Sequence, residues 1–149
     1  MNACQDPRID VVEATVRMCD HTDRREWKEL AGVFTEQVTV DYTSLVGGEP
    51  ATVPRDGLIE SWRQLLETLD ATQHLISNHV VALDGDQAHC TAQFQAVHVH
   101  QLAPGGSTFT LGGRYRFALA REREEWRITS VVMTAVWSDG NRALLGGGV

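Results

Sequence analysis

Residues 107–121 alternate between apolar and polar positions, and this pattern constrains the fold more than any other feature of the chain. Side chains at every second position are apolar or glycine, and the positions between them are mostly polar or charged. The first set is Phe109, Leu111, Gly113, Tyr115, Phe117 and Leu119, and the second includes Thr108, Thr110, Arg114 and Arg116. A period of two places successive side chains on opposite faces of a strand. The segment is therefore predicted to be a strand with one buried face.

Four other segments carry strand signals. They are residues 37–45, 72–83, 87–101 and 126–137. The second and third meet at Asp84-Gly85-Asp86, a sequence that favours a tight hairpin turn. Consecutive strands joined by short turns predict a long antiparallel sheet.

The first half of the chain is predicted to be mainly helical. A helix begins near Pro7 with Asp6 as its N-cap, and Ile9, Val12, Val16 and Cys19 recur at helical spacing on its expected buried face. Further helices are expected over residues 25–33 and 55–69. The last of these carries Leu58, Trp62, Leu65 and Leu69 on one side.

These elements predict an α+β fold in a single domain over residues 1–149. Three N-terminal helices followed by a sheet are best buried when the helices cover one concave face of a curved, mainly antiparallel sheet. Such a cone-shaped α+β barrel leaves a pocket between helices and sheet, where a small molecule can bind.

Charge and composition exclude several classes of function. The chain has 13 Lys plus Arg and 20 Asp plus Glu, which gives a net charge of −7 with neutral histidines. Nucleic acids and anionic membrane surfaces attract positive charge, so neither is an expected partner. There is no apolar run long enough to span a bilayer and no secretory leader pattern. Three cysteines without CxxC spacing, at positions 4, 19 and 90, fit unpaired thiols in a reducing cytoplasm.

Periodicity turns several polar residues toward the expected pocket. Asp23 follows Cys19 by one helical turn, although an exposed carboxylate past the helix end fits the spacing as well. Tyr42 shares a face with Val38 and Val40, where a core tyrosine bonded to the backbone is the alternative. His98 ends the most apolar face of its strand, after Cys90, Ala92, Phe94 and Ala96. A core histidine with satisfied hydrogen bonds is equally compatible with that position.

Alternation leaves the other histidines undecided. His74 and His79 lie on opposite faces of the same strand, and both faces are mixed. The His98-x-His100 spacing could chelate a metal, but no third ligand with suitable spacing follows it. Dinucleotide, phosphate-loop and serine-hydrolase motifs are also missing. We therefore expect neither a metal nor a cofactor.

Several short segments of the chain are similar to those of a known family. The sequence resembles the SnoaL-like branch of the nuclear transport factor 2-like superfamily, and within it the scytalone dehydratase-type lyases, over about residues 11–137. The segments that carry the resemblance are Asp20-His21-Thr22-Asp23-Arg24-Arg25-Glu26-Trp27, Val40-Asp41-Tyr42, Thr72-Gln73-His74-Leu75-Ile76, Ala96-Val97-His98, Trp126-Arg127-Ile128 and Trp137.

The resemblance implies a catalytic site made of Asp23, His74, Tyr42 and His98. The resemblance also implies that the His74 side chain, which alternation leaves undecided, faces the pocket. Such dehydratases place a second tyrosine directly before the aspartate, whereas this chain has Thr22, so Tyr115 is the candidate to supply the missing phenol from across the cavity. Substrate contacts are expected from Tyr115, Thr22, Phe94, Cys19, Trp137 and Trp62.

The reaction implied by this set is loss of water next to a carbonyl in a small apolar substrate of polyketide, steroid or terpenoid type. An isomerase or polyketide cyclase could use the same pocket, because each of these reactions can begin with the same proton abstraction. A ligand-binding or dimerisation module without catalysis is the alternative from another class. The resemblance also implies a homodimer or homotrimer that pairs through the outer face of the sheet.

Overall fold

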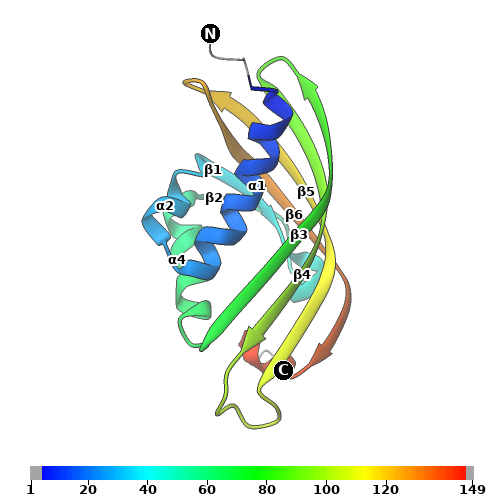
Figure 1. Ribbon diagram of the computed structural model, residues 1–149. Coiled ribbons are helices and arrows are strands. Elements are labelled where there is room, and N and C mark those ends of the chain that lie inside the picture. The colour runs from blue at the N-terminus through cyan, green and yellow to red at the C-terminus, as the bar shows by residue number, and fades with distance from the viewer. Residues whose placement is uncertain (1–4, 147–149) are drawn as a thin grey trace.

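The computed structural model describes residues 5–146 and shows helices packed against one face of a curved sheet (Figure 1). The helices within this range are α1 (Pro7–Arg24), α2 (Trp27–Ala31), α3 (Thr43–Val46), α4 (Arg55–Leu66) and the 3-10 helix η1 (Arg142–Leu145). The strands are β1 (Phe34–Asp41), β2 (Ala51–Pro54), β3 (Ala71–Asp84), β4 (Gln87–Val99), β5 (Thr108–Glu122) and β6 (Glu125–Gly140).

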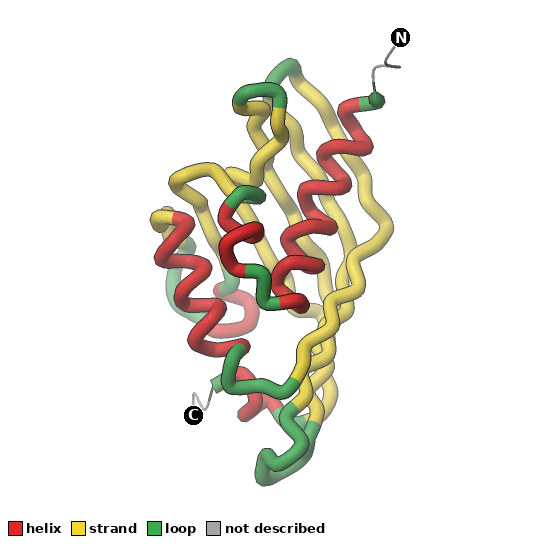
Figure 2. Tube along the Cα trace, turned by 60° about the vertical axis from the view of Figure 1, so that its left-hand side comes forward, coloured by secondary structure: helices red, strands yellow, loops and turns green. Residues whose placement is uncertain are grey.

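The described strands form one six-stranded sheet in the order β2-β1-β6-β5-β4-β3. Pairing is antiparallel throughout, except that β1 runs parallel to β6. The sheet curves but stays open, with β2 and β3 at its edges, and α1, α2 and α4 cover its concave side (Figure 2). The α+β class and the concave sheet covered by helices are confirmed.

Helix α1 begins as predicted but buries a different face. The Asp6 side chain accepts a hydrogen bond from the Arg8 backbone N–H, and Pro7 opens the helix. The buried residues are Val11, Ala14, Thr15, Met18, Cys19 and Thr22. The prediction was wrong for Ile9 and Val16, which are 50% and 41% exposed, and Val12 is half-buried. Small side chains at positions 14 and 15 face the sheet instead, which lets the helix approach it closely.

The predicted β3–β4 hairpin is confirmed, and its turn lies at Gly85-Asp86. The inner face of β4 carries Ala88, Cys90, Ala92, Phe94, Ala96 and His98, all of them buried. His98 is thus on the concave side, as alternation predicts.

Residues 41–54 depart from the sequence prediction. Strand β1 ends at Asp41, not at residue 45, because the Asp41 carboxylate accepts hydrogen bonds from both the backbone N–H and the hydroxyl of Thr43. The chain then turns into α3 and returns as the short strand β2, and neither element was predicted. Helix α4 also ends at Leu66, three residues earlier than expected.

A register shift in β3 places two histidines on the helix side of the sheet. The pairing with β4 slips between Ser77 and Val80, and Asn78 has a positive φ of 57°. His79 thereby reaches α1, where its Nε2–H donates to the Thr15 hydroxyl at 2.9 Å. The Thr15 hydroxyl in turn donates to the Val12 carbonyl. The strict alternation assumed for this strand therefore fails between His74 and His79.

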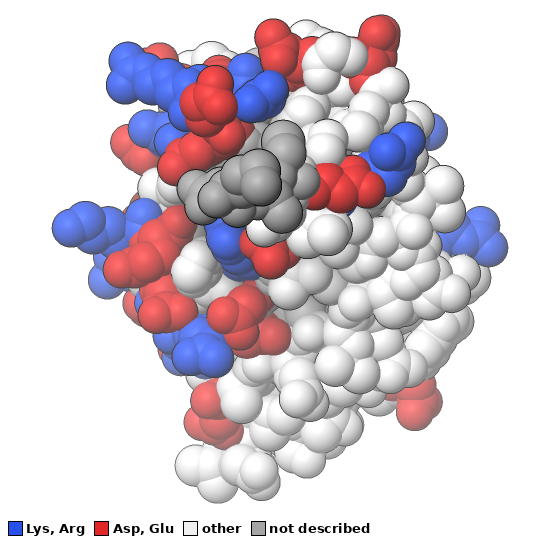
Figure 3. Space-filling model, turned by 45° about the horizontal axis from the view of Figure 1, so that its top comes forward, with Lys and Arg blue, Asp and Glu red and all other residues white. Residues whose placement is uncertain are grey.

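Charge is unevenly distributed over the surface. In Figure 3, acidic and basic side chains gather on the side of the helices, and the side of the strands is largely uncharged. Exposed residues of β3 and β4 include Gln73, Ser77, Thr91, Gln93 and Gln95. Whether a second copy covers the sheet remains a prediction, which light scattering would check.

Two further expectations concern membranes and thiols. No helix in residues 5–146 is both long and apolar enough to cross a membrane. Cys19 and Cys90 are buried and unpaired, and Cys4 lies outside the described residues.

A pair of glycines in β5 provides a test of how the sheet is packed. A Cβ at Gly113 would lie 2.1 Å from the Thr134 carbonyl oxygen, which is fixed in β6. A Cβ at Gly112 would lie 2.1 Å from the Trp137 indole, a half-exposed side chain that can move away. We expect Gly113→Ala to lower the free energy of unfolding by about 2–3 kcal/mol and Gly112→Ala by less than about 1 kcal/mol, measured by urea unfolding. Equal losses would contradict this packing.

Candidate active site

A cavity of about 570 Å³ lies between the concave face of the sheet and the helices. Most of its wall is apolar and comes from α1, α4 and β4–β6. The apolar lining includes Met18, Leu45, Leu58, Leu65, Leu66, Leu111, Met133 and Leu145. The volume lies within the range of small-molecule sites.

Asp23 joins the end of α1 to strand β3 through three hydrogen bonds. Its carboxylate accepts from the His74 backbone N–H at 2.7 Å, from the Thr72 hydroxyl at 2.9 Å and from His74 Nδ1 at 2.7 Å. Because β3 is an edge strand, its outward N–H groups have no strand partner, and Asp23 satisfies one of them. Arg25, the C-cap of α1, donates from Nη2 to the Leu69 carbonyl at 2.7 Å. This hydrogen bond holds the last turn of α1 in place.

This pairing determines the tautomer of the neutral His74 ring. A carboxylate only accepts hydrogen bonds, so Nδ1 carries the proton and Nε2 of the neutral ring has a free lone pair. The side chains of His74 and Asp23 are 14% and 19% exposed. His74 lines the cavity, whereas Asp23 lies behind it and does not.

His98 lies beside His74 on the neighbouring strand. The two ring centroids are 6.1 Å apart, with the planes nearly perpendicular. Nδ1 of His98 donates to the Phe109 carbonyl at 3.1 Å, which leaves Nε2 as the unprotonated nitrogen. Burial lowers the pKa of His98, and this outweighs the hydrogen bond to the Phe109 carbonyl, which raises it. The ring is therefore neutral at neutral pH.

Tyr42 and Tyr115 complete the polar wall of the cavity. Neither phenol forms a hydrogen bond to a residue within 5–146, and both side chains line the cavity. Burial raises the pKa of each hydroxyl above its ordinary value, and the neighbouring Tyr42 raises that of Tyr115 further. Both therefore stay protonated and can donate to a ligand. The Tyr42 ring packs edge-on against Trp62, and the Tyr115 ring lies 4.4 Å from that of Phe94.

The remaining residues expected at the site divide into two groups. Thr22, Cys19, Trp62 and Phe94 line the cavity together with the groups described above. The Thr22 hydroxyl donates to the Met18 carbonyl at 2.6 Å, and burial raises the pKa of the Cys19 thiol to about 12. Trp137 does not line the cavity, because its ring is half-exposed and packs over Gly112.

Sequence reasoning missed the part of the cavity wall that is formed by α3, by η1 and by one residue of α4. Ser61 of α4, Leu45 and Val46 of α3, and Arg142 of η1 all line it. Ser61 lies next to Trp62 on a predicted helix and could have been found there. The two short helices have no periodicity that would have revealed the other three residues.

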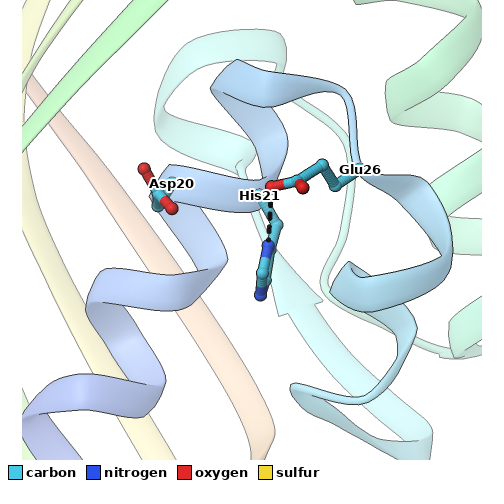
Figure 4. A group of neighbouring side chains, drawn as sticks. All are labelled: Asp20, His21 and Glu26. Carbon is cyan, nitrogen blue, oxygen red and sulfur yellow. Dashed lines mark hydrogen bonds and ion pairs between the residues drawn. The ribbon is translucent and has the colours of Figure 1, made fainter.

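One group of possible metal ligands lies outside the cavity. Asp20, His21 and Glu26 have ligand atoms within 4.8 Å of one another, the only such group found in residues 5–146 (Figure 4). Each is already engaged, since Arg24 donates to Asp20 at 3.0 Å and His21 Nδ1 donates to Glu26 at 3.2 Å. His98 and His100 belong to no group of three possible ligands within residues 5–146. We assign no metal to either place.

Comparison with known proteins identifies the family. The profile of the SnoaL-like domain matches residues 7–132. The chain belongs to the SnoaL-like family. Among curated proteins, none matches its sequence.

Solved structures with the same fold include members of several kinds. The Kfla4162 protein from Kribbella flavida is 30% identical, with 94% of this chain and 97% of that chain covered and a TM-score of 0.88. A candidate scytalone dehydratase from Novosphingobium aromaticivorans is 18% identical, with coverage of 91% and 88% and a TM-score of 0.80. A hexachlorocyclohexane dehydrochlorinase is 12% identical, with the same coverage and a TM-score of 0.77. The last two show a shared fold. A candidate dehydratase of the nuclear transport factor 2-like family from Streptomyces avermitilis shares it as well, at 13% identity, coverage of 86% and 95% and a TM-score of 0.72, which confirms the fold expected from the sequence.

The lowered pKa of His98 predicts a pH dependence of stability. The unfolded chain binds a proton at His98 more readily than the folded one, so stability is fully present above the unfolded pKa of about 6.5 and falls as the pH drops below it. His98→Gln removes this difference, and we expect its free energy of unfolding to fall less than that of the wild type between about pH 7.5 and 5.5. Urea unfolding at several pH values measures this.

The exposed His89 on the other face of β4 offers the matched control, His89→Gln. His79, whose pKa is lowered by burial as well, is present in all three proteins and contributes equally. If His98→Gln and the wild type lose the same stability, the assignment of a neutral buried ring is wrong.

Proposed function

We propose that this protein is a cofactor-independent lyase that removes water next to a carbonyl group of a small, largely apolar substrate. The observation that carries the proposal is the Asp23–His74 pair at the wall of an apolar cavity, in which the hydrogen bond to the carboxylate occupies Nδ1 and leaves Nε2 for a substrate. The presence of a dehydratase and a dehydrochlorinase among proteins of the same fold supports a lyase, since each name denotes an elimination.

His74 acts as the general base in this proposal. Its Nε2 takes the proton from the carbon next to the carbonyl, and the electrons of that C–H bond move into the enolate. When the enolate collapses, the C–O bond to the β-hydroxyl breaks, and the hydroxyl takes the proton back from His74 and leaves as water. Asp23 holds the ring in the required tautomer and stabilises the imidazolium that forms between the two steps.

Tyr42 and Tyr115 stabilise the enolate oxygen. Both phenols are protonated and lack a partner among residues 5–146, so they can donate to charge that develops in the transition state. In this proposal Tyr115 performs the role of the tyrosine that directly precedes the aspartate in scytalone dehydratase-type lyases. Thr22 occupies that position in this chain, and its hydroxyl donates to a backbone carbonyl. His98 binds the substrate hydroxyl through its unprotonated Nε2.

A β-hydroxy ketone tests both steps of the reaction at once. The compound 3-hydroxy-1-tetralone loses water to give 1-naphthol, which is fluorescent, and its α-hydrogens exchange with D2O if only the first step occurs. We expect the wild type to form 1-naphthol and His74→Asn to lose about 10²–10⁴-fold in rate. Tyr42→Phe and Tyr115→Phe are each expected to lose about 10–100-fold, because one donor to the enolate is removed.

The control is His89→Asn, which changes a histidine on the outer face of β4 and keeps the wild-type rate. Circular dichroism and urea unfolding show that each variant is folded. Exchange of the α-hydrogens without naphthol would favour the isomerase or cyclase. Binding with neither exchange nor elimination would contradict the proposal and favour the non-catalytic module.

A further inference from the structure

The cavity opens to solvent at the side where α3 and η1 meet. Val46, at the end of α3, lines the cavity and is 74% exposed, and the exposed residue Arg142 of η1 lines it as well. A hydrogen bond from the Arg142 guanidinium to the Leu45 carbonyl joins the two short helices. We call Leu45, Val46 and Arg142 the rim.

Arg142 is the one lining residue with a permanent charge among those described. Within residues 5–146 it has no carboxylate within salt-bridge distance, and the Leu45 carbonyl is its one hydrogen-bond acceptor. A guanidinium has five N–H donors, so most of them remain available at the rim. An arginine in this state is suited to a carboxylate, which it can bind through two parallel hydrogen bonds.

The part of the cavity wall formed by His74 disfavours an anion. Asp23 lies directly behind His74, and its carboxylate places negative charge next to the proposed base. An acidic ligand would therefore turn its charged end away from His74 and toward Arg142. Leu58, Leu65 and Leu111 line the wall and suit an apolar body.

We propose that the substrate is an amphipathic carboxylate whose acidic group binds Arg142 at the rim and whose carbonyl end reaches His74. The inference rests on the proposed function for the orientation of the carbonyl end, and it adds the chemical class of the substrate. Arg142 is a specificity-determining residue in this account and takes no part in the proton transfers.

A pair of nearly isosteric ligands tests the inference. We would measure the dissociation constants of 2-naphthoate and the neutral 2-naphthamide by calorimetry with the wild type and Arg142→Gln. The wild type is expected to bind naphthoate about five- to tenfold more tightly than naphthamide, and Arg142→Gln is expected to lose that preference while its affinity for naphthamide changes less than about twofold. Raising the salt from about 20 to 300 mM should reduce the preference of the wild type.

Two further variants make the result specific. Arg142→Lys keeps the charge without the planar pair of donors and should retain part of the preference. Arg8→Gln removes an exposed charge on the first turn of α1 and should retain all of it. An unchanged preference in Arg142→Gln overturns the inference, and so does a wild type that prefers naphthamide or binds neither compound.

Failure of this inference can be told apart from failure of the proposed function. His74→Asn keeps Arg142 and should keep the preference for naphthoate even though it cannot abstract a proton. If the wild type shows no exchange or elimination and Arg142→Gln still abolishes the preference, the proposed reaction is wrong and the carboxylate site stands.

Discussion

The carboxylate of Asp23 is the interaction on which both the fold and the site depend. It satisfies a backbone N–H on the edge strand β3 and at the same time holds the ring of His74. The same group thus fixes the end of α1 against the sheet and orients the proposed base. Because these two tasks share one side chain, the packing of α1 against the sheet also sets the position of the His74 ring.

The cavity follows from the way the sheet is curved and covered. Small side chains of α1 at Ala14 and Thr15 let the helix lie close to β3, whereas α4 lies farther along the concave face, with Trp62 at the cavity wall. The glycines of β5 allow β6 and Phe94 to approach closely. Polar groups at the end of α1 and on β3, β4 and β5 therefore converge on one apolar space.

Much of this arrangement could be predicted from the sequence, because alternation in β4 and β5 is unbroken where the site lies. His98 and Tyr115 were assigned to the inner face on that basis. His74 could not be assigned by parity, since the register shift at Asn78 brings His79 to the same side of the sheet. Its role rests on the resemblance, and Arg142 escaped notice because a four-residue helix leaves no periodic signal. The predicted buried face of α1 was the wrong one, because Cys19 belongs both to the predicted apolar face and to the face that is buried.

The central claim is that Asp23 holds His74 in the tautomer that leaves Nε2 unprotonated toward the cavity. Nitrogen-15 NMR of the histidine rings, with long-range proton correlations, measures this directly at neutral pH. The account predicts that His74 carries its proton on Nδ1 and has an Nε2 shift typical of an unprotonated nitrogen. A proton on Nε2 of the neutral ring would contradict it, because His74 would then have no lone pair available to a substrate.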